Sequence, residues 1–550
     1  MKSSDRGGAS ALRKFVFITG GVLSGLGKGV VTASIGLLLK LQGYRVSLQK
    51  IDPYVNVDAG TMNPYEHGEV FVTFDGKETD LDIGRYERFL NERLSASNYF
   101  TTGQVYWNVI RQERTGTFLG KTVQVIPHIT DEIKRLIRLP LDEAGADIGV
   151  IEVGGTVGDI EGLPFLEALR QMKDELPRED TFFIHVTLLP HIGTSDEIKT
   201  KPTQHSVKEL RAIGIQPDAI VARSDLPLPD SVKRKIALFC DVPQNNVIED
   251  PTLATIYHAP VMLNENRLTQ CVTGGLGLPP KSTDVSSWAD RIARIDEPAN
   301  RVSVGIAGKY VELKDAYMSI RDAFTHAGAG ENIGVDMHWI SSEDIAAHGP
   351  ARYLDELDGL LIPGGFGHRG IEGKVEAVQY VRERGVPFFG ICLGLQCAVI
   401  EFARNVLALA DANSTEFEEE TPHPVIGLLD EQLTITQKGG TMRLGDYETA
   451  LEADSTAAAS YNGQTIVERH RHRYEFNPAY RKPFEDAGLR ITGTSGNGLV
   501  EIVELTDHPW FVGVQFHPEF TSRLLQPHPL FCGFLQACLA RKRSSSSSAS

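Results

Sequence analysis

Cys392 lies in a pattern that could make its thiol a nucleophile. An apolar run leads into Gly390, Cys392 and Gly394, the thiol counterpart of the Gly-x-Ser-x-Gly turn that presents a nucleophile between a strand and a helix. The glycines permit a sharp turn, and the start of the following helix favours a thiolate. The pattern predicts a nucleophilic cysteine; the alternative is a buried core thiol, the commonest fate of cysteine.

A histidine and a carboxylate that could activate this thiol lie near the end of the chain. His517 ends an apolar run that begins at residue 510, and Glu519 follows two positions later. His517 could accept the thiol proton while Glu519 orients the imidazole. The oxyanion would need backbone donors, and the sequence offers the Leu393 N–H and the glycine-rich residues 363–367. Together these residues predict a cysteine hydrolase. The alternative for His517 is a structural histidine at the end of a strand whose hydrogen bonds are satisfied within the fold.

A glycine-rich segment near the N-terminus could bind phosphate. An apolar run precedes residues 19–29, and a helical pattern over residues 30–41, closed by Gly43, follows them. Backbone N–H groups of such a loop can surround phosphate oxygens while Lys28 reaches the terminal phosphates. The segment departs from the common motif, because five residues separate Gly21 from Gly27 and Gly29 replaces the usual magnesium-binding Ser or Thr. We expect nucleotide binding, with a ligand-free glycine turn as the alternative.

Two acidic residues could supply oxygen ligands to magnesium. Glu152 lies near the end of the apolar run 148–153, so it would sit beside the phosphate loop at the carboxyl edge of a sheet, and Asp82 lies in a second candidate segment. Taken alone, each acid is more readily interpreted as a solvated or helix-capping carboxylate than as a metal ligand, so the prediction depends on its context.

A polar segment at residues 191–206 could bind a second phosphorylated substrate, since it combines lysines, hydroxyls and an amide. From the residues alone, a charged loop entering a helix at Ser206 is the slightly favoured interpretation. Lys235 is equally ambiguous by itself.

The bulk composition narrows the classes of protein. The chain has 550 residues, of which 41% are hydrophobic and 23% are charged. This length is greater than a single hydrophobic core usually supports, so at least two domains are expected. A net charge of -17 disfavours nucleic acid and anionic lipid as partners. Six cysteines without a C-x-x-C pair suit a reducing compartment, and no run reaches the ~18 apolar residues of a membrane span. We therefore expect a cytoplasmic enzyme without a membrane segment.

Apolar runs alternate with helical stretches twice along the chain, which predicts two parallel α/β domains. We expect a flexible N-terminus at residues 1–13, a first domain at 14–280 that ends in the Gly- and Pro-rich residues 274–280, and a second domain at 301–540. Between the two domains we expect a charged linker at 281–300 with only a short amphipathic stretch around residues 288–295. The serine-rich residues 541–550 are expected to be disordered.

The motifs resemble known families over almost the whole chain. Residues 301–539 resemble the triad-type glutamine amidotransferases, and the strings at residues 19–29, 50–54, 67–73, 152–161 and 199–206 resemble the synthetase domain of the CTP synthases. The resemblance implies an α/β fold: an N-terminal P-loop-type parallel α/β synthetase (amidoligase) domain plus a C-terminal α/β class I glutamine amidotransferase domain.

The resemblance also implies site residues. Catalysis would use Cys392, His517 and Glu519, magnesium would be held by Asp82 and Glu152, and His67 falls where the family is thought to route ammonia. ATP would be bound by Gly25, Leu26, Gly27, Lys28, Gly29, Val30 and Asp82. UTP or the product CTP would be bound by Ser24, Asp159, Ile160, Glu161, Lys199, Thr200, Lys201, Pro202, Thr203, Gln204 and Lys235. Glutamine would be bound by Gly365, Leu393, Gly394, Leu395, Gln396, Glu416 and Arg473.

The implied activity is that of a ligase of de novo pyrimidine nucleotide biosynthesis. ATP would phosphorylate O4 of UTP, and ammonia from glutamine hydrolysis would replace that oxygen to give CTP. The family further implies Mg²⁺ as cofactor, GTP as allosteric activator, CTP as feedback inhibitor and a homotetramer.

Two alternatives remain from the residues themselves. The cobyrinic and cobyric acid amide synthases would also combine a phosphate loop with a thiol triad, but residues 199–204 with Lys235 suit a nucleoside triphosphate better than a large carboxylated ring. The second alternative is a phosphate-loop ATPase switch with a non-catalytic glutaminase domain. The intact triad of Cys392, His517 and Glu519 argues against this alternative.

Overall fold

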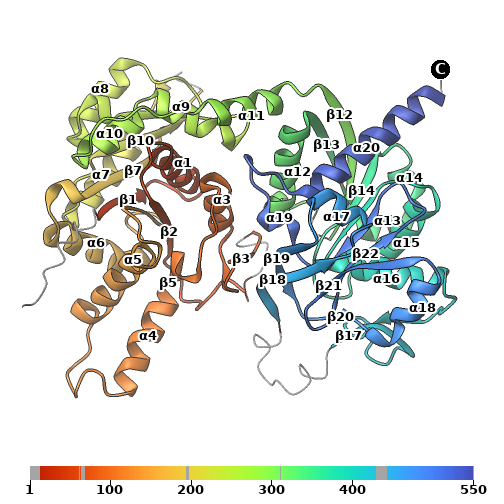
Figure 1. Cartoon of the computed structure of the whole chain (residues 1–550). Coiled ribbons are helices and arrows are strands. Elements are labelled where there is room, and N and C mark those ends of the chain that lie inside the picture. The colour runs from red at the N-terminus through yellow and green to blue at the C-terminus, as the bar shows by residue number, and fades with distance from the viewer. Residues whose placement is uncertain are drawn as a thin grey trace, which may run out of the picture. The chain divides into compact units, whose positions relative to one another are not determined.

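The chain forms two compact units in a computed structural model that describes residues 13–60, 62, 68–193, 197–309, 311–428 and 442–548 (Figure 1). Unit 1 consists of the described residues of Met1–Thr61 and Arg85–Ala289, and unit 2 of those of Met62–Gly84 and Asp290–Ser550. The boundary after Ala289 falls inside the segment expected as a linker. Residues 62–84, which we expected in the first domain, group with the second unit instead.

Unit 1 is built on a seven-stranded sheet in the order β11-β10-β7-β1-β6-β2-β5, and all its pairings are parallel. Its strands are β1 (Lys14–Gly20), β2 (Val46–Asp52), β5 (Tyr99–Thr101), β6 (Ile148–Val153), β7 (Thr181–Leu188), β10 (Ala219–Ser224) and β11 (Val247–Pro251). Every residue of β1, β2 and β6 is buried, as expected of a parallel sheet covered on both faces. A two-stranded pair, β8 (His191–Ile192) and β9 (Glu197–Ile198), lies apart from the sheet.

The helices of unit 1 connect these strands, which confirms the predicted parallel α/β arrangement. They are α1 (Lys28–Leu41), α4 (Thr102–Arg114), α5 (Thr130–Ala144), α6 (Leu163–Glu175), α7 (Lys201–Ala212), α8 (Asp230–Cys240), α9 (Ala259–Glu265) and α10 (Leu268–Gly275). Helix α1 ends as predicted: Gly43 has a φ of 82°, and its N–H donates to the Lys40 carbonyl at 2.8 Å.

Strand β1 is the point where the strand order of unit 1 reverses. The chain passes from β1 to β2 on one side of the sheet, whereas β7 pairs with β1 on the other side. In open parallel sheets, ligands bind in the crevice at the carboxyl ends of such strands. The segment after β1 is therefore where the fold favours a ligand.

Unit 2 is built on a nine-stranded sheet in the order β13-β12-β14-β15-β23-β22-β21-β18-β19. The pairings from β13 to β23 are parallel and those from β23 to β19 are antiparallel. Its strands are β12 (Asn300–Gly308), β13 (Ile333–Ser341), β14 (Gly359–Ile362), β15 (Phe388–Ile391), β18 (Arg443–Leu451), β19 (Thr465–His472), β21 (Leu489–Ser495), β22 (Val500–Leu505) and β23 (Phe511–Val514), with a second small sheet of β16 (Ala412–Ser414), β17 (His423–Gly427) and β20 (Glu475–Phe476).

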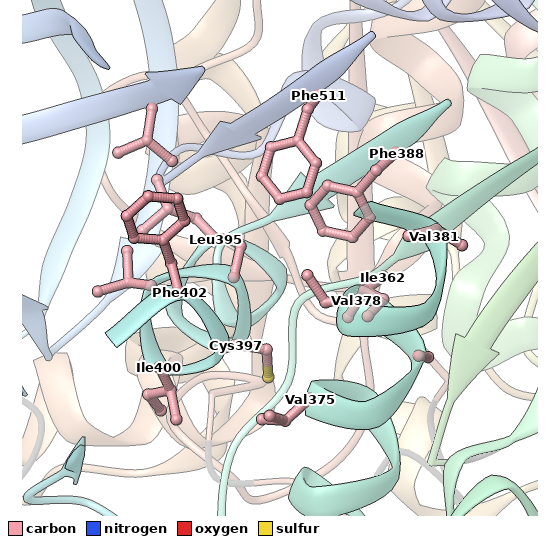
Figure 2. Packing of buried hydrophobic residues seen from close by; sticks show 14 of the residues in the cluster. Ile362, Val375, Val378, Val381, Phe388, Leu395, Cys397, Ile400, Phe402 and Phe511 are labelled. Carbon is pink, nitrogen blue, oxygen red and sulfur yellow. The ribbon is translucent and has the colours of Figure 1, made fainter. Parts of the chain in front are cut away.

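Two apolar layers hold the helices of unit 2 against this sheet. The helices are α12 (Met318–Glu331), α13 (Ser342–His348), α14 (Ala351–Leu354), α15 (Ile371–Glu383), α16 (Leu393–Asn405), α17 (Thr456–Tyr461), α18 (Arg481–Asp486), α19 (Pro518–Thr521) and α20 (Pro529–Ser548). One layer packs α15 and α16, and the other packs α12, α17 and α20. Figure 2 shows the first layer, where Phe388 and Phe511 of neighbouring strands lie with ring centroids 4.6 Å apart. This packing fixes the junction between β15 and α16.

Residues 68–84 group with unit 2 because their backbone bonds to its sheet. They form the strand pair β3 (Phe71–Val72) and β4 (Glu78–Thr79) and the start of α3 (Leu81–Leu90). Arg469 of β19 donates to the Val72 carbonyl at 2.8 Å, and the Asp446 N–H donates to the Phe74 carbonyl at 2.8 Å. These contacts between residues distant in sequence could not be read from the local pattern.

Two segments have more regular structure than expected. The expected linker contains helix α11 (Ser286–Asp296), where Trp288 is buried and donates to the Tyr257 carbonyl at 2.8 Å. Helix α20 continues to Ser548 and so includes residues 541–548, for which we expected disorder. Packing of its first half nucleates the helix, and each further turn then costs little; the hydroxyls of Ser544 and Ser545 also donate to the Arg541 carbonyl.

Within the described ranges, every helix is too short or too polar to cross a membrane.

Candidate functional site

The turn that carries Cys392 has the strained geometry of a nucleophile turn. Cys392 lies between β15 and α16 with a φ of 52° and a ψ of -101°. Residues other than glycine rarely adopt this backbone conformation, because it costs about 1–3 kcal/mol. It persists only where the surrounding structure enforces it. Added Cβ atoms would lie 2.7 Å from the Gly394 carbonyl carbon at Gly390, and 2.2 Å from the Ile362 oxygen at Gly394. Glycine is therefore required on both sides of the cysteine.

His517 and Glu519 form the pair that the sequence predicted. His517 Nδ1 lies 2.7 Å from Glu519 Oε1, and the imidazole stacks on Phe520 with centroids 4.9 Å apart. Burial lowers the pKa of His517, but Glu519 and the Cys392 sulfur outweigh burial and raise the pKa to about 10. The imidazole is therefore held as a cation beside the sulfur.

Gly364 places the thiol and the imidazole next to each other. A Cβ added at Gly364 would lie 2.7 Å from His517 Cε1 and 3.5 Å from Cys392 Cβ. The two side chains therefore contact the same small space, which is the arrangement of a nucleophile and its proton acceptor.

The predicted oxyanion and glutamine residues gather around the same turn. Leu393 is the first residue of α16, and its side chain lies 3.3 Å from a Cβ added at Gly365. The Gly367 N–H donates to Glu416 Oε1 at 2.8 Å, which holds the glycine-rich loop. Burial raises the pKa of Glu416, while the Gly367 N–H and the charge of Arg473 oppose that effect.

The remaining predicted glutamine residues lie in the first turn of α16. Gly394, Leu395 and Gln396 are buried there, and Gln396 Nε2 donates to the Tyr474 carbonyl at 3.2 Å. The structure thus brings the predicted glutamine-binding residues together in unit 2. Their roles toward glutamine stay predictions.

Two residues near the thiol were missed at the level of sequence. Gln515 donates to Cys392 Sγ at 3.7 Å. Lys374 of α15 is 2% exposed; burial lowers its pKa, and electrostatic interactions with Cys397, Cys392 and Glu416 oppose that effect. Gln515 could have been found from its place two residues before His517, whereas Lys374 gives no signal in the sequence.

The phosphate loop of unit 1 has the geometry expected of an anion site. It begins at the end of β1 and ends at Gly27, with Gly25 and Gly27 at φ values of 74° and 89°. Residues that carry a side chain rarely adopt these backbone conformations, so glycine is favoured at both positions. Lys28 starts α1, folds back over Gly20 and donates to the Gly155 carbonyl at 2.6 Å. The loop therefore places an ammonium group across the carboxyl ends of β1 and β6.

Glu152 lies beside this loop and is 1% exposed. It accepts hydrogen bonds from Lys50 at 3.0 Å, from Thr32 at 3.3 Å and from Tyr86. Lys50 Nζ is also 3.7 Å from Asp52 Oδ1. We predicted no role for Lys50, Thr32 or Tyr86; residues 50–54 entered only as part of the resemblance.

The donor chemistry around Glu152 fits magnesium. No set of three or more His, Cys, Asp or Glu side chains in the described residues could hold a metal ion by itself. Mg²⁺ usually binds one or two carboxylates and takes its other ligands from phosphates and water, so Glu152 beside a phosphate loop suits it. Asp82, the other predicted ligand, lies in the first turn of α3 and belongs to unit 2, where its N–H donates to Asp80 Oδ1 at 2.8 Å.

The second polar segment forms the start of α7. Lys199 Nζ lies 2.5 Å from Glu197 Oε2, and both Lys199 and Lys235 of α8 lower the pKa of that carboxyl. Gln204 donates to Thr200 Oγ1 at 3.0 Å, and Thr203 contacts Thr187 of β7 at 2.5 Å. The predicted residues from Lys199 to Gln204, with Lys201 and Pro202 in the first turn of α7, and Lys235 thus converge on one region of unit 1.

Other predicted nucleotide residues lie on loops of unit 1. Ser24 is exposed in the phosphate loop, and Leu26 is buried there. Asp159 accepts from the Thr156 N–H at 2.9 Å and precedes a short 3₁₀ helix, where Ile160 is 80% exposed. His67, predicted to route ammonia, lies outside the described residues.

A buried thiol at a strained strand-to-helix turn, next to an imidazole that is paired with a carboxylate, is the arrangement of a cysteine hydrolase. Comparison with known families agrees: residues 14–278 match the family "CTP synthase N-terminus", and residues 312–537 match "Glutamine amidotransferase class-I". The expected fold class is thereby confirmed.

The chain belongs to the CTP synthase family. It is 54% identical over 529 residues to the CTP synthase of Herpetosiphon aurantiacus, covering 96% of this chain and 99% of that protein. It is also 54% identical over 538 residues to the CTP synthase of Methanocaldococcus jannaschii, with the same coverage. The glutaminase domain of Trypanosoma brucei CTPS, solved with bound acivicin, is 37% identical; the match has a TM-score of 0.41 and covers 44% of this chain and 94% of that domain.

Proposed function

We propose that the protein converts UTP to CTP, using ATP and the amide nitrogen of glutamine. The observation that carries this proposal is the presence of two centres in one chain that is 54% identical, over 96% of its length, to CTP synthases. Unit 2 has the residues to release ammonia, and unit 1 has those to bind phosphate. Neither competing function is favoured by a specific contact.

Glutamine hydrolysis would begin with attack of Cys392 Sγ on the amide carbon. His517 would accept the thiol proton, and Glu519, whose Oε1 lies 2.7 Å from His517 Nδ1, would stabilise the resulting positive charge. The Leu393 N–H, with a backbone donor from Gly365, would bind the oxyanion. Collapse of the tetrahedral adduct gives a thioester and transfers the His517 proton to the leaving nitrogen, which departs as ammonia; water then releases glutamate and restores the thiol.

In unit 1, O4 of UTP would attack the terminal phosphorus of ATP, and ADP would leave. Backbone N–H groups from Gly25 to Val30 and the Lys28 ammonium would balance the charge of the phosphates, since phosphoryl transfer depends mainly on positioning and charge neutralisation. Glu152 of unit 1 would hold Mg²⁺, which supplies further positive charge to the phosphate oxygens when bound. Asp82 as a second ligand rests on the family resemblance alone. Ammonia then attacks C4, and phosphate leaves.

Nucleotide selection would depend on the start of α7. Lys199 and Lys235 both interact with the exposed carboxylate of Glu197. Their positive charges would bind the UTP phosphates. Ser24 would contribute from the phosphate loop, and residues 159–161 would bind the product CTP as feedback inhibitor. The family resemblance supports GTP as an activator, a homotetramer and a cytoplasmic location.

One assay tests the proposed function. The purified protein is incubated with UTP, ATP, Mg²⁺ and glutamine, and the nucleotides are separated and identified by mass. We expect CTP, ADP, phosphate and glutamate in equal amounts. Glutamate formation without CTP, with either glutamine or ammonia as the nitrogen source, would refute the proposal.

A further inference from the structure

His185 joins the phosphate loop of unit 1 to helix α7. It lies in β7, is fully buried, and is paired in register with Thr19 of β1. Its Nδ1 lies 2.9 Å from Thr19 Oγ1, and its Nε2 lies 2.8 Å from Ser206 Oγ. One imidazole therefore connects the end of β1, directly before the phosphate loop, with the helix that begins at Lys201.

Gly21, the first residue of the loop, packs against the contact between His185 and Ser206. The Gly21 N–H donates to the Val186 carbonyl at 3.0 Å. A Cβ added at Gly21 would lie 1.6 Å from Ser206 Oγ and 2.6 Å from His185 Nε2. The loop backbone is thus packed against the two polar side chains without space for another atom.

The imidazole is neutral, so one of its ring nitrogens donates a hydrogen bond and the other accepts one. Burial, reinforced by the charge of Lys28, lowers the pKa of His185 to about 3. The Thr19 hydroxyl lies 3.3 Å from the Ile184 carbonyl, to which it can donate. In the tautomer that carries the proton on Nδ1, His185 donates to Thr19 Oγ1 and the Ser206 hydroxyl donates to Nε2, so each of these protons has an acceptor.

We propose that Thr19, His185 and Ser206 form a positioning relay that fixes the phosphate loop against α7. The proposal rests on the proposed function, which assigns ATP to the loop and UTP to residues 199–204. The relay sets the position of the ATP terminal phosphate relative to the UTP that receives it. His185 contacts neither substrate directly and acts through the two elements it joins.

The relay should affect the rate of phosphoryl transfer more than substrate binding. The groups that would bind each triphosphate remain when the relay is broken, but the two elements can shift relative to each other. A misplacement of about 1 Å can lower a rate about 100-fold. Loss of the relay should therefore lower kcat and leave both KM values nearly unchanged.

Two substitutions at Thr19 separate positioning from packing. Thr19→Val keeps the volume and removes the hydroxyl, whereas Thr19→Ser keeps the hydroxyl and leaves a methyl-sized void. With ammonia as nitrogen source, Thr19→Val should lower kcat for CTP formation about 10- to 100-fold, with KM for ATP and UTP within about threefold. Thr19→Ser should stay within about threefold of the wild-type kcat. A packing role predicts the opposite order and would overturn the proposal.

Further variants keep the test valid if Thr19→Val folds poorly. Ser206→Ala removes the other end of the relay and should show the same loss of kcat. His185→Gln can reach Ser206 but not Thr19 and should be intermediate. Thr273→Val, which removes a buried hydroxyl bonded to the Thr269 carbonyl in α10, is the matched control and should be unchanged.

Glutamine hydrolysis and melting temperature are measured on every variant to confirm that it is folded. Ser206→Ala with wild-type kcat would overturn the relay. Wild-type protein that makes no CTP from ammonia would refute the proposed function itself, and with it the substrates on which the relay depends.

Discussion

Replacing Gly364 by alanine should selectively disable glutamine hydrolysis. The added Cβ would lie 2.7 Å from His517 Cε1, about 0.7 Å short of ordinary van der Waals contact. The imidazole has little freedom to retreat, because Glu519 holds its Nδ1 at 2.7 Å and Phe520 stacks against its face. The alanine must therefore move the imidazole, the Cys392 turn or both.

A shift of this size should lower kcat for glutamine hydrolysis about 10- to 100-fold, since a misplacement of about 1 Å costs about 100-fold. Overpacking should also destabilise unit 2 by about 1–3 kcal/mol, a modest effect that leaves it folded at 25 °C. CTP formation from added ammonia should be unchanged, because the phosphate loop lies in unit 1.

The assay compares glutamate release with CTP formation from glutamine and from ammonia. Gly496→Ala is the matched control: a Cβ there meets nothing within 4 Å, so both activities should equal those of the wild type. Wild-type glutaminase activity in Gly364→Ala would show that the imidazole can move without cost and would refute the reasoning.

Three further predictions follow from the two centres. Cys392→Ala should abolish glutamine-dependent synthesis but retain synthesis from ammonia; if ammonia fails to restore CTP formation, the two centres are not separate. Lys28→Ala should lower synthesis from either nitrogen source at least about 100-fold while glutamine hydrolysis continues, and retained synthesis would exclude Lys28 from the mechanism. His517 holds a proton up to about pH 10 when folded and releases it near 6.5 when unfolded, so the melting temperature of unit 2 should fall as pH rises from 6.5 to 10. Glu519→Gln should reduce that dependence; an unchanged profile would contradict the role of Glu519.

The local signals in the sequence were sufficient for the elements that carry the chemistry. The glycines around Cys392 predict a sharp turn because their places cannot hold a Cβ, and the structure shows the close contacts that explain this. The strand before residue 19, the helix closed by Gly43 and the strand ending at Val153 were also predicted. Each depends on neighbours within a few residues.

Contacts between distant residues could not be predicted in the same way. Residues 68–84 join unit 2 through bonds from Arg469 and Asp446, which lie more than 350 positions away. Lys50 and Tyr86 meet Glu152 only after three separate elements fold together. The sequence likewise gives no sign that Lys374 is buried near the thiol, because its helix also contains exposed charged residues.

One isotope experiment tests the central claim most directly. The protein is supplied with UTP labelled with ¹⁸O at O4, with glutamine labelled with ¹⁵N in its amide, and with ATP and Mg²⁺. If ATP activates O4 and the amide nitrogen replaces it, the CTP will contain ¹⁵N and the released phosphate will contain ¹⁸O. CTP formed while the ¹⁸O appears in water instead of phosphate would contradict the account.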